Sequence, residues 1–157
     1  MRTLDASFFQ NGKAAKGLKP KRFSTTELEP GSVAYVASLT AIERDLCEVQ
    51  WQKTRRTETS VGLRPFLVTW CLCDEQNKRM FDAGDDPLKL SESFAAAVKS
   101  VSGMPSRVIS RAFDAATELN GFSESDVEEL EKNLEATAGE CGNGDMQPTP
   151  ESAVASG

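Results

Sequence analysis

The chain has 157 residues, of which 18 are basic and 24 acidic, so its formal net charge is −6, and it contains no histidine. Without histidine it can form no Ser-His-Asp or Cys-His nucleophile pair, no imidazole general base and no histidine metal site. The length suits one domain, since ~100–200 residues per domain is usual, and the composition favours a cofactor-free binding or assembly protein over an enzyme.

The cysteines do not have the spacing of a structural zinc site, which usually combines two Cys-x₂₋₄-Cys pairs or cysteine with histidine. They are Cys47, Cys71, Cys73 and Cys141. We therefore expect reduced thiols and no metal. The first 20 residues lack the apolar stretch of a signal peptide, and no run of ~18–20 apolar residues predicts a membrane helix. We expect a soluble cytoplasmic protein.

Charge and composition predict a folded body between two mobile ends. Met1–Arg22 holds six bases and one acid, and residues 1–21 are expected to form a flexible basic arm. Ser123–Gly157 holds nine acids and one base. Within it, residues 137–157 have too little apolar surface to offset the entropy of ordering, so we predict a disordered acidic tail there. Residues 22–136 remain as the folded domain.

The folded domain is expected to begin with a short β-hairpin. Phe23–Leu28 and Val33–Ala37 contain residues that favour strands, and Glu29–Ser32 supplies a Pro-Gly turn between them. Two strands alone are only marginally stable in water, so we expect the hairpin to pack on helices or on another subunit.

A capping box predicts the first helix. Thr40 and Glu43 have the spacing at which a hydroxyl and a carboxylate satisfy the first backbone N–H groups. The helix is expected to extend to about Lys53. Its predicted apolar face consists of Ile42, Leu46 and Val49, with Cys47 beside them.

The next apolar segment favours a helix over a strand. Helical spacing relates Leu63, Phe66, Leu67, Trp70 and Cys71. A strand is the alternative, because Phe66–Cys73 is almost continuously apolar. After it, Asp74–Lys78 predicts a turn, and Asp82–Pro87 predicts a solvated loop that lacks the register of a calcium-binding loop.

Three further helices are expected. One begins at Ser91 and has Phe94, Ala95, Val98 and Val101 as its apolar stripe. The second follows Pro105, ends at Asn120-Gly121, and has Val108, Ile109, Ala112, Phe113, Ala116 and Leu119 on its core face. A second capping box, Ser125 to Glu128, predicts an acidic helix to about Ala136, with Val127, Leu130 and Leu134 as its apolar stripe.

These elements predict a mainly α domain of four to five helices with a short N-terminal β-hairpin. Its apolar faces exceed what a thin helical domain easily buries, so some of them are candidates for partner contact. The candidate residues are Phe66, Trp70, Val108, Ala112 and Phe113. Core packing is the alternative for all five. The glutamates at positions 128, 129 and 131 read as a solvated helix start and not as catalytic groups.

Part of the chain resembles the tail assembly chaperones of long-tailed phages, the class of the lambda G protein. The resemblance lies in Ser38–Asp45, Leu63–Cys73 with the following Asp74–Lys78, Val108–Gly121 and Asp126–Asn133. It extends over roughly residues 22–134, and its most recognisable part is FDAATELNG followed by DVEELEKN. The arm at residues 1–20 is longer and more basic than the resemblance implies, and residues 91–103 are less regular.

The resemblance implies a specific role. Such chaperones bind the long helical tape measure protein, keep it soluble and help the tail tube protein polymerise around it in the host cytoplasm. They are typically absent from the mature virion. A longer form made by programmed frameshifting often contacts the tube protein. Glu131-Lys132-Asn133 can be encoded as GAA-AAA-AAC, which contains a slippery heptamer, although a polar helix end is the favoured explanation of these residues.

Two other classes remain as alternatives, with self-association left open. A head–tail connector or structural tail component would need more β-structure and ring assembly. A nucleic-acid-binding regulator would need a basic recognition helix, and the cleanest helix offers only Arg107 and Arg111 as bases. We therefore expect no nucleic acid and no membrane among the partners.

Overall fold

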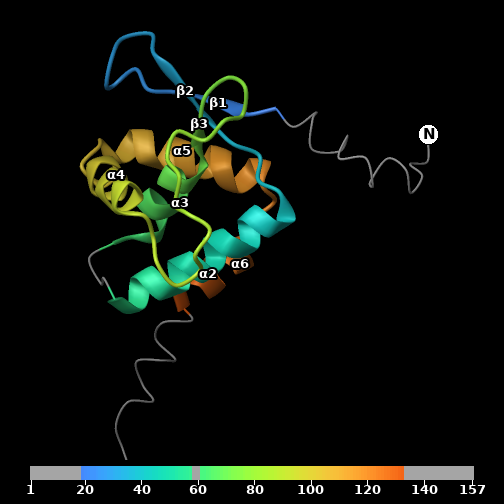
Figure 1. Cartoon of the computed structure of the whole chain (residues 1–157). Coiled ribbons are helices and arrows are strands. Elements are labelled where there is room, and N and C mark those ends of the chain that lie inside the picture. The colour runs from blue at the N-terminus through green and yellow to red at the C-terminus, as the bar shows by residue number, and fades with distance from the viewer. Residues whose placement is uncertain (1–18, 58–60, 133–157) are drawn as a thin grey trace, which may run out of the picture.

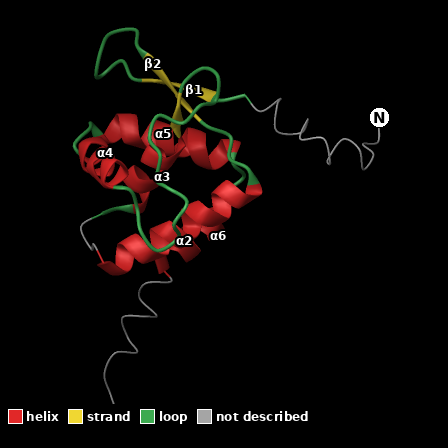
Figure 2. Ribbon diagram, in the orientation of Figure 1, coloured by secondary structure: helices red, strands yellow, loops and turns green. Residues whose placement is uncertain are grey.

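The computed structural model describes residues 19–57 and 61–132, and these form a helical domain with a small sheet at one end (Figures 1 and 2). In chain order the elements are β1 (Lys21–Ser24), β2 (Val33–Val36), α2 (Ala41–Thr57), α3 (Leu63–Cys71), β3 (Leu72–Cys73), α4 (Glu92–Ser102), α5 (Ser106–Leu119) and α6 (Glu124–Lys132). The predicted mainly α domain with an N-terminal hairpin is confirmed. The predicted tail and residues 1–18 of the predicted arm lie outside the described residues.

The sheet is antiparallel, with strand order β1-β2-β3. β1 pairs with β2 in the register Phe23↔Ala34, as the predicted hairpin requires. The connection is longer than the predicted Pro-Gly turn and begins at Thr25, whose N–H donates to the Ser32 carbonyl at 3.1 Å. Gly31 adopts φ +76°, a left-handed conformation that glycine accepts without strain.

Helix α3 lies at the centre of the molecule and contacts α2, α4 and α5 (Figure 1). Its nine residues are almost all apolar, and Leu63 and Phe66–Cys71 are buried. The helical prediction is thus confirmed for Leu63–Cys71. The alternative strand assignment holds only at the end, where Leu72 pairs with Val36 as part of β3.

Helix α2 begins as predicted but buries a different face. The Thr40 N–H donates to the Glu43 carboxylate at 2.7 Å, and the Glu43 N–H donates to the Thr40 hydroxyl at 3.3 Å, which completes the capping box. The buried face consists of Cys47, Gln50, Trp51 and Thr54. The predicted face was wrong: Ile42 and Val49 are exposed and Leu46 is only partly buried. Trp51 supplies far more apolar area than the smaller aliphatic side chains, and this sets how the helix is rotated.

The remaining helices follow the prediction closely, with small corrections. On α4 the buried apolar residues are Phe94, Ala97, Val98 and Val101, so Ala97 takes the place of the predicted Ala95, which is only partly buried. Ser91 caps α4 by accepting from the Phe94 N–H, and α5 buries the predicted core face except Leu119, which is partly buried. The capping box of α6 lies two residues earlier than predicted. Ser123 and Asp126 form it, because the Ser123 N–H donates to Asp126 at 2.8 Å and the Asp126 N–H donates to the Ser123 hydroxyl at 3.1 Å.

Candidate partner-binding groove

The five residues predicted as partner contacts lie in the core of the domain. Phe66 and Trp70 on α3, and Val108, Ala112 and Phe113 on α5, are each at most 7 % exposed. The Phe66 ring packs between Trp51 and Phe94, with centroids 5.3 and 5.7 Å away. In the closed domain none of the five offers a surface to a partner, so a contact site has to be sought among exposed residues.

Several large apolar side chains remain exposed among the described residues. They are Leu28, Val33, Ile42, Val49, Met80 and Leu88. Leu88, which is 68 % exposed, stands beside a groove on the surface. Isolated exposed apolar residues are ordinary, whereas an exposed leucine at the edge of an apolar hollow marks a candidate contact site.

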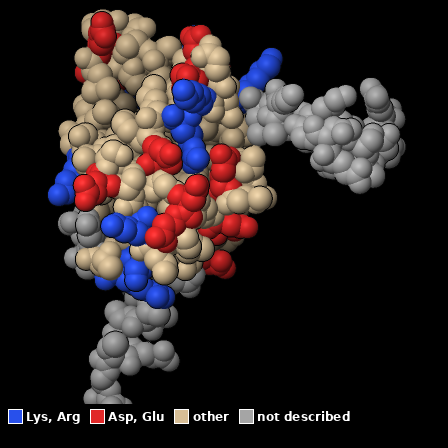
Figure 3. All heavy atoms as spheres, in the orientation of Figure 1, with Lys and Arg blue, Asp and Glu red and all other residues tan. Residues whose placement is uncertain are grey.

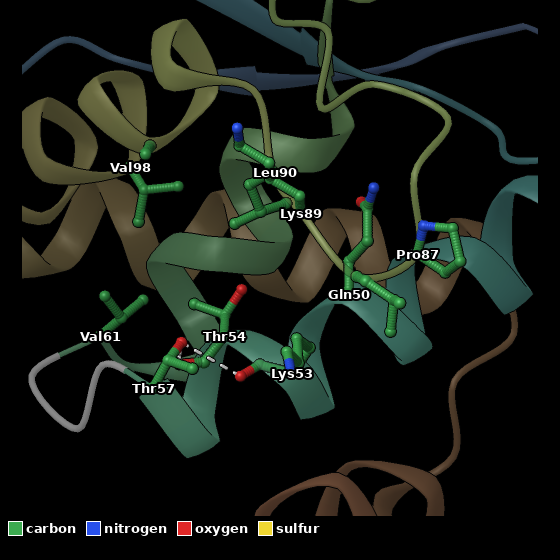
Figure 4. A pocket seen from close by; sticks show the side chains of 11 residues that line it. Gln50, Lys53, Thr54, Thr57, Val61, Pro87, Lys89, Leu90 and Val98 are labelled. Atoms are coloured by element: carbon green, nitrogen blue, oxygen red, sulfur yellow. Dashed lines mark hydrogen bonds between the residues drawn. The ribbon is translucent and has the colours of Figure 1, made fainter.

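The groove lies between the C-terminal half of α2, the segment Pro87–Leu90 and the first turns of α4 (Figure 4). Its volume is about 220 Å³. The lining consists of Gln50, Lys53, Thr54, Thr57, Val61, Pro87, Leu88, Lys89, Leu90, Ala95 and Val98. Figure 4 shows Leu90 and Val98 across from the side chains of α2, so the hollow has apolar residues on one wall and polar residues on the other.

Gln50, on α2, holds in place the loop that forms one wall of the groove. Its side-chain amide donates to the carbonyl oxygens of Gly84 and Asp86, each at 3.1 Å. Its amide oxygen accepts from the Trp70 indole N–H at 2.9 Å. Because Gln50 is buried and all three bonds are internal, the segment before Leu88 is held against α2.

The start of α4 fixes the other end of the same segment. The Ser91 hydroxyl donates to the Asp82 carbonyl at 2.6 Å, and the Ser91 N–H donates to the Ala83 carbonyl at 3.0 Å. Asp86 accepts from the Leu88 N–H at 2.8 Å. These bonds close residues 82–91 into a loop anchored at both ends, with the Leu88 side chain exposed.

The chemistry of the groove suits a contact surface and not a reaction centre. Lys53 and Lys89 supply positive charge at its rim. The Thr57 hydroxyl already donates to the carbonyls of Lys53 and Thr54, at 3.2 and 3.1 Å. The volume is below the ~300–1,000 Å³ of ordinary small-molecule sites. It would instead accommodate one apolar side chain, with anionic groups nearby to meet the lysines.

The thiols in the described part of the chain are buried and chemically quiet. Burial raises the pKa of Cys71 to about 12 and that of Cys73 to about 11, and it raises the pKa of Cys47 well above its usual value. A thiol with a raised pKa is a poor nucleophile and a poor metal ligand at neutral pH. Residues 19–57 and 61–132 contain no cluster of three His, Cys, Asp or Glu side chains suited to a metal ion.

Sequence reasoning placed residues 82–87 in a solvated loop and did not identify the groove that follows it. The signal available was Leu88 and Leu90 in a segment otherwise composed of acids, alanine, glycine, proline and lysine. Their distance from α2 could not be inferred, because the Gln50 bonds that bring them together span more than 30 residues, 34 to Gly84 and 36 to Asp86.

Comparisons with known protein families, with curated proteins and with solved structures find no match to this chain. Across the residues that the structure describes, no helix combines the length and apolar character needed to span a bilayer.

Proposed function

We propose that this chain is a phage tail assembly chaperone that binds an amphipathic helix of the tape measure protein in the groove between α2 and Pro87–Leu90. The resemblance of residues 22–134 to such chaperones supplies the class of client. The exposed Leu88 beside an apolar groove with a lysine rim is the observation that carries the proposal.

An amphipathic helix fits this surface chemistry. Helix-in-groove recognition inserts apolar anchors spaced by three or four residues into a hydrophobic hollow. One such anchor would fill the space between Leu90 and Val98, and Leu88 would cover it from the rim. Acidic residues one turn away on the client helix would meet Lys53 and Lys89. Burying the Leu88 side chain contributes about 1.5–3 kcal/mol.

In this role the closed core is the scaffold and not the contact. Phe66 and Trp70 hold α2 and α3 together, and the Trp70–Gln50 bond positions the groove wall. The tail tube protein would be reached through a longer, frameshifted form. The protein would act in the host cytoplasm and be absent from the mature virion.

The test is co-expression with the longest helical open reading frame downstream of the gene. We expect the client to be insoluble alone and to co-purify with this protein. Leu88→Glu should weaken the complex at least about tenfold, because it places a charge where apolar contact is expected. Leu28→Glu, which introduces the same charge at another exposed leucine, is the matched control and should leave binding unchanged.

Two results would contradict the proposal. One is a client whose solubility does not depend on this protein. The other is a complex that loses affinity equally with both leucine variants, since the groove would then have no special role. Stable rings formed by the protein alone would favour a connector or structural tail component instead.

A further inference from the structure

A second surface on α2 lies beside the groove and has the spacing of a helix-pairing seam. Its five positions alternate by four and three residues: Ile42, Leu46, Val49, Lys53 and Arg56. This 3.5-residue repeat is the spacing at which one helix face remains in register with a partner helix. Ile42 is 81 % and Val49 45 % exposed, and Leu46 between them is partly buried.

The opposite face of α2 packs against the core of the domain. Cys47, Trp51 and Thr54 are buried there, so the exposed Ile42 and Val49 are not needed to hold α2 in the fold. The outer face of a helix in a monomeric domain is normally polar. The outward Ile42 and Val49, with Leu46 between them packing only partly against the core, therefore indicate a partner helix.

Charges along the seam are arranged with opposite signs at its two ends. Asp45 flanks the N-terminal half, whereas Lys53 and Arg56 lie in the C-terminal half. None of these three side chains has an ion pair within the described ranges, although their neighbours Glu43 and Arg44 do, with Arg79 and Glu48. Figure 3 shows the same separation, with acidic side chains gathered where α2 begins and basic ones where it ends.

We propose that α2 pairs antiparallel with α2 of a second copy of this chain, with Val49 on the twofold axis. In such an antiparallel pair, a residue that precedes Val49 faces the residue equally far after Val49 in the other copy. Asp45 of each copy therefore lies opposite Lys53 of the other. The same pairing places Ile42 against the aliphatic stem of Arg56, where a long basic side chain can cover apolar surface. The same patch thus serves both subunits, as a twofold contact requires.

The charge pattern selects this direction over a parallel pair. In a parallel arrangement Asp45 would face Asp45, and Lys53 would face Lys53, so every flanking contact would be repulsive. A seam from Ile42 to Arg56 is about 22 Å long at 1.5 Å rise per residue. One helix pair of that length falls at the small end of specific interfaces, so we expect a dimer that dissociates at micromolar concentrations.

Charge reversal tests the pairing directly, with sedimentation equilibrium of the full chain as the readout and no client present. Asp45→Lys and Lys53→Asp should each weaken dimerisation about tenfold or more, because each converts two attractive contacts into repulsive ones. The double variant should recover dimerisation. An equimolar mixture of the two single variants should form a heterodimer, since the introduced charges complement each other.

Controls separate this contact from folding and from general charge. Asp114→Lys makes the same charge change at an exposed position on α5 and should leave the wild-type dissociation constant unchanged. Val49→Asp, at an exposed site, should abolish the dimer without changing the helical circular dichroism signal.

A wild-type chain that remains monomeric at several hundred micromolar would overturn the proposal. So would a dimer that Val49→Asp does not affect, because a different surface would then form it. A monomer in which Val49→Asp lowers client binding would assign the seam to the client and likewise overturn self-pairing. The first two of these results do not depend on whether the groove binds a tape measure protein.

Discussion

The indole N–H of Trp70 donates to the amide oxygen of Gln50 at 2.9 Å, and both side chains are 1 % exposed. The amide nitrogen of the same Gln50 side chain donates to the carbonyls of Gly84 and Asp86. One buried polar side chain thus joins α2, α3 and the loop that forms the groove wall. Packing alone would not hold that loop, because its residues are mostly polar or exposed.

Replacing Gln50 by leucine should destabilise the domain by about 2–4 kcal/mol, because it leaves a buried indole N–H and two loop carbonyls without their partner. The midpoint of urea unfolding measures this change. Hydrogen exchange should also show faster exchange of the Ser91 N–H, which donates to the loop carbonyl of Ala83. Gln52→Leu, at an exposed position on the same helix, is the control. Equal stability of the two variants would show that the Gln50 bonds contribute nothing net.

The sequence predicts best those parts of the fold that depend on residues close together in the chain. The capping box from Thr40 to Glu43 and the apolar face of α5 depend on residues within one or two turns, and both were predicted. The strand ending of α3 was predicted only as an alternative, because Leu72 becomes a strand residue through pairing with Val36. That partner lies 36 residues away in the chain.

The rotation of α2 shows why local pattern was not sufficient there. Ile42, Leu46 and Val49 form the more regular aliphatic stripe, and pattern alone assigns them to the core. In the structure the helix instead buries Trp51, whose indole N–H donates to the Leu130 carbonyl of α6 at 3.1 Å. The site itself could not be predicted for the same reason, since a buried glutamine has no periodic signal.

Phe113→Ala should show whether the residues predicted from the sequence as partner contacts are part of the folded core. The Phe113 side chain is 7 % exposed and the Arg64 guanidinium lies 5.4 Å from its ring centroid. Loss of this buried ring should cost about 3–5 kcal/mol of folding stability, seen as a large drop in the urea midpoint. Leu28→Ala, at an exposed site, is the control. A Phe113 variant with wild-type stability and weaker client binding would instead make Phe113 a contact residue.

Trp51→Phe should loosen α6 in particular. The substitution removes the indole N–H that donates to the Leu130 carbonyl, together with part of a ring that packs against Phe66. We expect a loss of about 1–3 kcal/mol, with faster hydrogen exchange in residues 124–132 than in α5. Uniform acceleration across all helices would contradict a specific link between Trp51 and α6. The remaining tryptophan, Trp70, should keep the blue-shifted fluorescence of a buried indole.

The burial of the cysteines predicts that the folded protein reacts slowly with thiol reagents. Burial raises the pKa of Cys71 to about 12 and that of Cys73 to about 11, so at pH 8 very little thiolate is present at either site. We expect Cys47, Cys71 and Cys73 to resist alkylation in the folded protein and to react at once in 6 M guanidinium chloride. Mass spectrometry of the labelled peptides measures this. Rapid labelling of Cys71 in native buffer would mean that the α3–β3 junction opens readily.

Asp126 should make part of the folding stability of the domain depend on pH. The Ser123 backbone N–H that donates to its carboxylate, the Ser123 hydroxyl and the nearby Arg44 lower its pKa from the ordinary value of 3.8. A depressed folded-state pKa gives stability that is present above the unfolded value of 3.8 and is lost as the pH falls through the folded value. Asp126→Asn should therefore be less stable than wild type at pH 7 and nearly equal to it once the pH lies below the lowered pKa of the folded state. Glu129→Gln removes a charge from the same helix without removing the cap, so its stability difference should be small at pH 7. Urea unfolding from pH 2 to 7 measures all three proteins, and a deficit of Asp126→Asn that persists unchanged in acid would exclude a contribution from the ionised carboxylate.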